Sequence, residues 1–318
     1  MKLKYKILWI EDEKSSIKIK ARNIRRYLEN DYGFECKEED LIVLDYEEFL
    51  EIYVVDNKIK EDSGIEQFDL LLVDFNLGEE EHTGDKLIQI IRDDSIYSEI
   101  LFYSSDLNSL IKKLNNHFID GVFTSVRDEL ENKVKKLIKV TIKKVQDVNN
   151  LRGLIMAEVA ELDRIKEKIL LLGSEKIPDK HLEKYTLKQV KKSNNKNINK
   201  VNDYNETIEN VTYSMLLEQA GFIDANKKAY ATGEILGKLK ILEPINKKDF
   251  SEPYIKNILG MRNKFAHVEE CDGEDEEGNS CKMIGNIPFT EKKCIEIRKE
   301  IRMYKGLLEK IYKKVENK

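Results

Sequence analysis

The feature that most constrains the fold of this chain is a set of five short apolar segments in its first 125 residues. They are KILWIE at 6–11, LIVLD at 41–45, FDLLLVD at 68–74, EILFYSS at 99–105 and GVFTS at 121–125. The longer segments between them, at 14–29, 47–59, 83–93 and 107–118, carry apolar residues at helical spacing. Short runs that are apolar throughout are typical of parallel strands covered on both faces. The alternation therefore predicts an open, five-stranded parallel α/β sheet.

The pattern changes after Asp128, where strand-like segments stop. Residues 126–147 have apolar residues at helical spacing and predict a linking helix. Five more helices are predicted at 150–173, 207–223, 228–242, 251–268 and 291–315. The scarcity of turn formers, 15 Gly and 4 Pro, also favours helix. We expect an α/β domain at 1–147 and an all-α helical-bundle domain at 148–318.

Two inserts interrupt the second domain. The segment 184–201 is rich in Lys and Asn, and we expect a mobile loop there. The segment 271–281 is acidic and rich in turn residues. It lacks the full pattern of a calcium loop, so we expect a solvated hairpin.

Composition narrows the class of protein. The chain has 55 basic and 60 acidic residues, a net charge of −5, so any nucleic-acid binding needs a local basic patch. Its 4 cysteines form no CxxC pair, which is typical of reduced thiols, and we expect a cytoplasmic protein. No apolar stretch approaches the roughly 18 residues of a membrane helix, so we expect no membrane partner.

Three acidic residues follow two of the predicted strands. Glu11 and Asp12 come after the first strand, and Asp74 ends the third. The carboxyl ends of parallel strands share one edge of a sheet, so these carboxylates should converge there. Clustered carboxylates call for a hard cation such as Mg²⁺, and an Asp so placed can attack phosphorus. The alternative is that the acids simply cap helices.

These residues resemble a response-regulator receiver domain, a flavodoxin-like fold. The motifs ILWIEDE, LLVDFNL with a later TG, and ILFYSS carry the resemblance over about residues 4–130. The family's pattern implies that Mg²⁺ is held by Glu11, Asp12, Asp74 and the backbone carbonyl of Asn76. It further implies that Asp74 is the phosphoacceptor, that Ser104 senses phosphorylation, and that a sensor histidine kinase of a two-component system is the partner.

The chain departs from the receiver pattern after the fifth strand. The family has a Lys there, usually followed by Pro, whereas this chain has Ser125 and Val126. That Lys pairs with phosphoryl oxygens, so its absence removes a charge-assisted contact. Arg127 is a possible substitute on which the prediction does not rely. Both phosphorylation at Asp74 and a receiver-like module that is never phosphorylated remain open.

The second domain contains RNKFAH at 262–267. Arg262 offers an always-charged fork for phosphate, and His267 can exchange a proton near neutral pH. Together they can support RNA cleavage by attack of the 2′-hydroxyl without a metal. On an ideal helix, however, side chains five residues apart point about 140° from each other. The helix must therefore bend or end there, or a second subunit must complete the site.

In its helical context, this motif resembles that of HEPN-domain ribonucleases, with the likeness spanning about residues 148–318. Only the short motif is specific. The family implies a homodimer with two motifs facing across a cleft, an RNA substrate and no cofactor for cleavage. Arg262 would orient the phosphate, His267 would act as acid and base, and Asn263 would assist. Some members are inactive binders, so an Arg and a His that only pack a helix remain the alternative.

A group of lysines adds a possible RNA contact: Lys188, Lys191, Lys192 and Lys196. Phosphate contacts need only positive charge, although a solvated segment would look the same. The combined hypothesis is a receiver-like input that controls a HEPN endoribonuclease in a stress or anti-phage response. The alternative is a non-catalytic signalling adaptor whose helical domain only dimerises or binds a partner.

Overall fold

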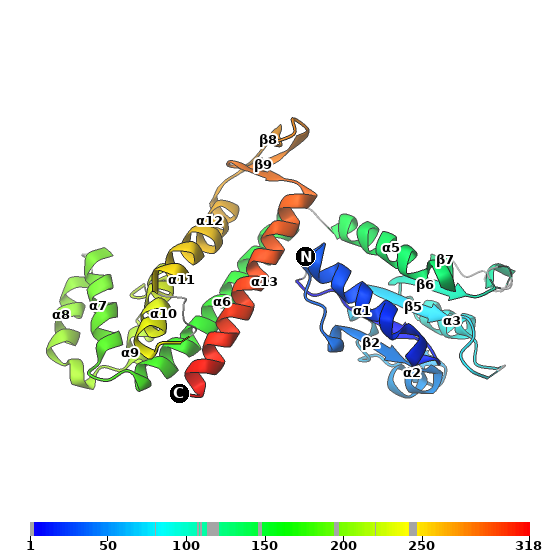
Figure 1. Ribbon diagram of the computed structural model, residues 1–318, viewed down its shortest axis with the longest axis horizontal. Coiled ribbons are helices and arrows are strands. Elements are labelled where there is room, and N and C mark those ends of the chain that lie inside the picture. The colour runs from blue at the N-terminus through cyan, green and yellow to red at the C-terminus, as the bar shows by residue number, and fades with distance from the viewer. Residues whose placement is uncertain are drawn as a thin grey trace. The chain divides into compact units, whose positions relative to one another are not determined.

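The computed structural model describes residues 3–79, 81–106, 108, 110–112, 121–145, 148–193, 197–219, 221–241 and 247–318. The chain divides into two compact units, Met1–Asp147 and Val148–Lys318. The first is an α/β unit and the second is predominantly helical (Figure 1).

A five-stranded parallel sheet forms the centre of the first unit. Its strands are β1 (Ile7–Ile10), β2 (Leu41–Leu44), β5 (Leu70–Asp74), β6 (Glu99–Ser104) and β7 (Val122–Val126), in the order β2-β1-β5-β6-β7. All residues of β1 and β5 are buried, because helices cover both faces. The predicted five-stranded parallel sheet is therefore confirmed.

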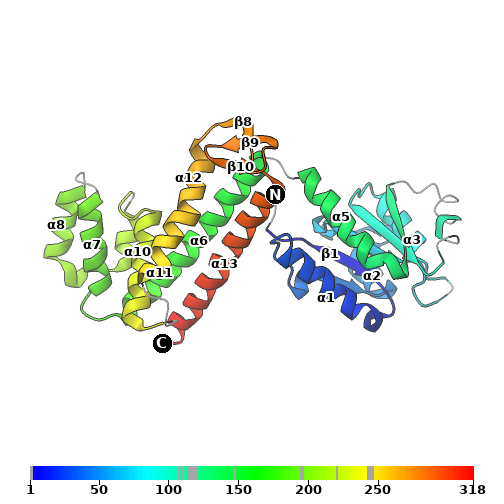
Figure 2. The same cartoon turned by 45° about the horizontal axis from the view of Figure 1, so that its top comes forward.

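Four helices of the first unit lie within the described residues: α1 (Lys14–Asn30), α2 (Tyr46–Tyr53), α3 (Gly84–Asp93) and α5 (Leu130–Val145). The apolar sides of α2 and α3 share one core with the sheet. α1 and α5 contact each other, side by side (Figures 1 and 2). The helix expected at 107–118 lies largely outside the described residues.

Two boundaries differ from the prediction. The helix expected at 47–59 ends at Tyr53, and β3 (Val54–Val55) and β4 (Lys58–Ile59) form a short hairpin. Its turn residues Asp56 and Asn57 both have positive φ, a conformation that Asp and Asn tolerate better than most residues.

The range 126–147, expected as one linking helix, is helical only from Leu130. Val126 ends β7, and Arg127–Glu129 form a 3₁₀ turn. Leu130, Val134 and Ile138 are buried, and α5 contacts β6 and β7. This helix therefore packs in the first unit.

The second unit is built around the long helix α6. Its helices are α6 (Val148–Lys176), α7 (His181–Ser193), α8 (Ile198–Glu206), α9 (Tyr213–Glu218), α10 (Ala225–Leu239), α11 (Lys247–Tyr254), α12 (Gly260–His267) and α13 (Glu291–Glu316). α6 contacts α13, α10 and α12, and runs beside α13 in both views (Figures 1 and 2). A π-helical turn, Ile255–Leu259, joins α11 to α12. The predicted helical second region is confirmed.

Two segments of this unit differ from the prediction. The helix expected at 207–223 is reduced to α9, whose first turn is capped by the Thr212 hydroxyl 3.3 Å from the Met215 amide. The expected mobile loop at 184–201 was wrong: most of it belongs to α7 and α8, because Leu187, Val190 and Val201 are buried.

The acidic segment does form the expected hairpin. Strands β8 (Glu270–Glu274), β9 (Ser280–Ile284) and β10 (Ile287–Phe289) make an antiparallel sheet that extends beyond the helices (Figures 1 and 2). Among all helices that the structure describes, none is long and apolar enough to cross a membrane.

Candidate functional site

Three carboxylates meet at the carboxyl edge of the parallel sheet. Glu11 follows β1 directly, Asp12 comes next, and Asp74 is the last residue of β5. One oxygen from each lies within 4.8 Å of the others. Glu11 and Asp74 are buried, and Asp12 is exposed. The structure thus brings together the three acids singled out by the sequence, and this all-oxygen donor set suits a hard divalent cation.

Arg127 holds two of these acids. Its Nη2 atom donates to Asp74 Oδ2 in a short contact and lies 3.3 Å from Glu11 Oε1. The guanidinium carbon also lies 5.6 Å from the centroid of the Tyr103 ring, within the range of a cation–π contact. The 3₁₀ turn after β7 brings the side chain back over the strand ends. Ser125 does not substitute for the lysine of the receiver pattern, because its buried hydroxyl donates to the Val126 carbonyl at 3.0 Å.

Two successive hydrogen bonds link the Glu11 carboxylate to buried aromatic side chains. The Tyr103 hydroxyl donates to Glu11 Oε2 at 2.6 Å, and the Trp9 indole donates to the Tyr103 hydroxyl at 2.7 Å. The sequence reasoning missed both aromatic residues. A signal was available, since Trp9 lies two residues before Glu11 and so shares its face of the strand, and Tyr103 pairs with Asp74 in the sheet register.

Burial dominates the electrostatics of the site. It raises the pKa of Asp74 to about 7, with repulsion from Glu11 acting in the same direction and Arg127 opposing. Burial also raises the pKa of Glu11, against the Tyr103 hydrogen bond and the charge of Arg127. The pKa of Tyr103 lies well above its usual value because the hydroxyl is buried, so it remains a donor. A bound divalent cation would favour the ionised carboxylates.

The loop after Asp74 depends on a glycine. A Cβ at Gly84 would lie 2.1 Å from the Asp74 carbonyl oxygen, so only glycine fits there. Asn76 is exposed in this loop and pairs with Thr83 through an antiparallel bridge. Ser104 ends β6, and its buried hydroxyl accepts from the Asp106 amide at 3.0 Å. The predicted sensing residue thus lies at the same sheet edge as Asp74.

No protein-family model matches the chain, and no curated protein matches it. Solved response regulators resemble the first unit. Phosphorylated RcpA, a cyanobacterial phytochrome response regulator, is 17% identical with a TM-score of 0.33 and covers 44% of this chain and 96% of its own. Chemotaxis protein CheY4 of Vibrio cholerae is 17% identical with a TM-score of 0.30, covering 43% and 98%. Mn²⁺-bound Rcp1 is 18% identical with a TM-score of 0.28, covering 42% and 91%.

In the second unit, Arg262 and His267 occupy one regular α-helix. Arg262 is half-buried, and its Nε and Nη2 atoms donate to Asn263 Oδ1 at 3.2 and 2.8 Å. Asn263 and His267 are exposed, and His267 is the last residue of α12. The π-helical turn precedes Arg262, so nothing bends the helix between the two residues. They point about 140° apart, and one copy does not bring them together.

Arg262 lies near a buried charge cluster that the sequence reasoning missed. Lys166 on α6 is fully buried, with its Nζ 2.6 Å from Asp163 Oδ1 and 4.3 Å from the ring centroid of Tyr254. Burial lowers the pKa of Lys166 to about 8, against the attraction of Asp163, and the charges of Lys228 and Arg262 lower it further. In the sequence, Lys166 looks like one of many charged residues on the solvent-exposed face of a helix. Its burial could therefore not be predicted.

The lysines predicted as an RNA contact lie in or just after α7 in the sequence. Lys188, Lys191 and Lys192 are exposed on the last turns of α7, and Lys196 lies outside the described residues. Arg152 on α6 donates to the Val268 carbonyl at 2.9 Å and so fixes the chain immediately after His267. Arg152 is therefore a positioning residue for the end of α12.

Proposed function

We propose that this protein is a signal-controlled endoribonuclease, in which the α/β unit is a phosphorylatable receiver and the helical unit is a metal-independent HEPN-type ribonuclease. The single observation that carries the input half is the convergence of Glu11, Asp12, Asp74 and Arg127 at one sheet edge. The output half rests on the RNKFAH motif of α12 and on the exposure of its histidine.

In the input half, the carboxylate of Asp74 attacks the phosphorus of a phosphohistidine on the kinase. The P–N bond breaks, the imidazole leaves, and Asp74 becomes an acyl phosphate. Glu11, Asp12, Asp74 and the Asn76 carbonyl would hold a divalent cation, which would neutralise charge on the phosphoryl oxygens. Arg127 supplies a second positive charge to those oxygens, in place of the missing lysine. The Ser104 hydroxyl then turns toward the phosphoryl group and alters the sheet edge.

In the output half, two copies place their α12 helices across one cleft. Arg262 and His267 of one helix point about 140° apart and cannot both face the same phosphate. In a dimer, the second copy provides the missing side chain. His267 removes the proton of the 2′-hydroxyl and returns a proton to the leaving 5′-oxygen, while Arg262 stabilises the phosphate and Asn263 holds the guanidinium. The products are a 2′,3′-cyclic phosphate and a 5′-hydroxyl end.

The RNA path would include the exposed lysines of α7, Lys188, Lys191 and Lys192, together with Lys196. A role in a stress or anti-phage response, where cutting RNA halts translation, follows from family analogy alone. The competing function is a non-catalytic adaptor, and the separation of Arg262 and His267 within one copy favours it.

The test is cleavage of total cellular RNA in EDTA by the wild type, His267→Ala and a matched control. His181→Ala is the control, because it removes another histidine of the same unit, one that pairs with Glu234. We expect the wild type and the control to leave 5′-hydroxyl ends and His267→Ala to be slower by about 100-fold or more. Equal cutting by all three proteins would refute the role of His267, and intact RNA throughout would favour the adaptor.

A further inference from the structure

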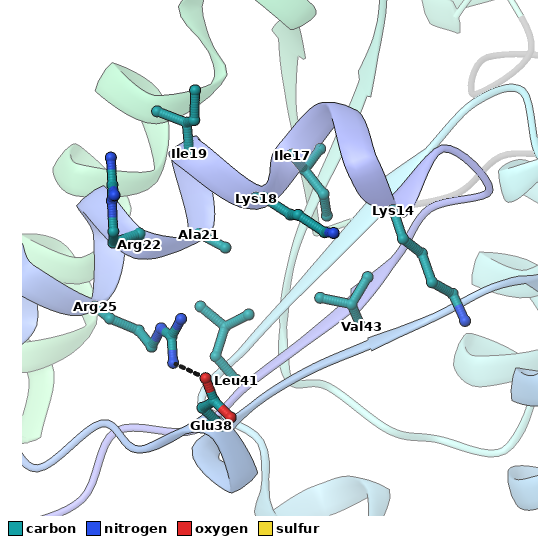
Figure 3. A pocket seen from close by; sticks show the side chains of 10 residues that line it. All are labelled: Lys14, Ile17, Lys18, Ile19, Ala21, Arg22, Arg25, Glu38, Leu41 and Val43. Atoms are coloured by element: carbon teal, nitrogen blue, oxygen red, sulfur yellow. Dashed lines mark ion pairs between the residues drawn. The ribbon is translucent and has the colours of Figure 1, made fainter.

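The first unit carries a groove beside the edge strand β2 of its sheet, and none of the three clustered acids lines it. It lies between α1 and the edge strand β2 and has a volume of about 460 Å³ (Figure 3). Its lining residues are Lys14, Ile17, Lys18, Ile19, Ala21, Arg22, Arg25, Glu38, Leu41 and Val43. The proposed phosphorylation and RNA cleavage use none of them.

The groove combines positive charge with an apolar floor. Lys14 and Arg25 at its two ends are already paired, Lys14 with Asp45 and Glu48 and Arg25 with Glu38. Lys18 and Arg22 between them are exposed and have no ion pair within the described part of the chain. Two cations one helical turn apart therefore face solvent in a protein whose net charge is −5.

The strand beside Lys18 and Arg22, β2, is the edge strand of the sheet. The Leu44 carbonyl accepts from the Glu11 amide at 2.8 Å, so the backbone groups of Leu44 point toward β1. Backbone direction alternates along a strand, and those of Val43 therefore point outward. An unpaired edge of this kind binds an additional extended strand. The groove thus fits an extended segment with acidic side chains.

This chain contains such a segment. β8 is itself the edge strand of its sheet, and Glu270, Asp272 and Glu274 alternate along it, so their exposed carboxylates share one face. The middle acid, Asp272, also pairs with Lys282 of β9 at 2.8 Å, but its side chain remains 89% exposed. Alternate residues of a strand are about 6.8 Å apart, and residues four apart on a helix advance about 6 Å. The spacing of the acids therefore matches that of Lys18 and Arg22.

We propose that the groove of one copy binds β8 of a second copy as an added strand, with its carboxylates facing Lys18 and Arg22. This contact joins the input unit of one molecule to the helical unit of another, so a change at the receiver acts on its partner's effector. The proposal does not depend on RNA cleavage, and it stands if the helical unit is only an adaptor.

The test uses two complementary charge-reversed copies that carry different tags. One copy has Glu270→Lys with Glu274→Lys and keeps its groove. The other has Lys18→Glu with Arg22→Glu and keeps its strand. Each copy alone sets like charges against each other, whereas the mixed pair restores opposite charges at the contact. The proteins are treated with a zero-length carbodiimide, which joins a lysine to a carboxylate only when the two touch, and linked peptides are identified by mass.

In the wild type we expect a link between Lys18 and an acid of β8. We expect at least a tenfold loss of that link in either altered copy alone, and its return in the co-expressed pair, where the substituted sequences show that it joins two molecules. The control copy keeps the wild-type groove and strand and carries Lys136→Glu with Lys139→Glu, at two exposed lysines of α5. It should cross-link like the wild type. No link in the wild type, or none in the mixed pair, would overturn the proposal.

Discussion

Both units of this protein contain a buried charge cluster, but the clusters are assembled in different ways. In the first unit, Glu11, Asp74 and Arg127 come from the ends of three strands far apart in the sequence. In the second unit, Lys166 and Asp163 lie one turn apart on α6, and α11 adds Tyr254. In a parallel sheet, the topology alone brings the carboxyl ends of the strands to one edge. Between packed helices, the side chains that contact each other depend on the packing at each residue. Only the first kind of site can be located from sequence order.

The largest effect that would sharpen this contrast is on phosphoryl transfer. Asp74→Asn should abolish incorporation of phosphate from acetyl phosphate, because an amide is no nucleophile toward phosphorus. Intact-protein mass spectrometry measures the added phosphate. Asp93→Asn, an exposed acid of α3, is the control and should incorporate as the wild type does. Labelling that survives in Asp74→Asn would mean that the convergent acids are not the reactive site.

Two glycines, one from each unit, differ in the space around them. Gly84→Ala should lower the free energy of unfolding by about 2–3 kcal/mol, since its Cβ would overlap the Asp74 carbonyl. Gly153→Ala on α6, where nothing lies within 4 Å, should raise it by up to about 1 kcal/mol through better helix propensity. Urea unfolding followed by circular dichroism measures both. Effects of the same sign would contradict the difference in local space at Gly84 and Gly153.

The buried Lys166 should make the stability of the second unit depend on pH. With its pKa lowered to about 8 from 10.5, the native state binds fewer protons than the unfolded chain between these values. The free energy of unfolding should therefore rise with pH across that window, and the cost of the buried charge is fully present below it. Lys166→Met should remove this rise and stabilise the protein at pH 7 by about 1–3 kcal/mol.

Urea unfolding at pH 7, 8.5 and 10 checks this pH dependence. Lys310→Met removes an exposed lysine of α13 and should leave the slope unchanged. If Lys166→Met were instead strongly destabilising at pH 7, the pair with Asp163 would be a net stabilising contact.

The smallest effect concerns the competition between Arg127 and a metal. Its guanidinium holds the two carboxylates that a divalent cation would use, so Arg127→Gln should bind Mn²⁺ about tenfold more tightly, about 1.4 kcal/mol. The only tryptophan, Trp9, is linked to Glu11 through Tyr103, so its fluorescence should follow the titration. Arg26→Gln, an exposed arginine of α1, controls for charge. Unchanged affinity in Arg127→Gln would mean that the arginine moves aside without cost.

The predictability of each element follows its physics. Buried parallel strands are apolar throughout and were found from sequence, as were the acids at their ends. Arg127 could not be relied on, because its reach depends on a 3₁₀ turn that leaves no periodic signal. The lysine-rich stretch that begins at residue 184 looked like a loop, because its charges concealed the buried Leu187 and Val190.

In the helical unit, the sequence singled out Arg262 and His267 as candidates, and it did not predict the side chains around them. Helical periodicity shows that a residue lies on a helix, and packing between helices decides which neighbours it meets. Lys166 and Tyr254 are examples, because their contact joins two helices that are about 90 residues apart in the sequence.

The π-helical turn Ile255–Leu259 has a mechanical consequence for the direction of Arg262. A π turn advances through a smaller angle per residue than an α turn, so changing these five residues to α geometry would rotate α12 by roughly a quarter turn about its own axis. That rotation would swing Arg262 out of the neighbourhood of Lys166 and Tyr254. The π-helical turn that precedes α12 therefore determines the direction in which the Arg262 side chain points.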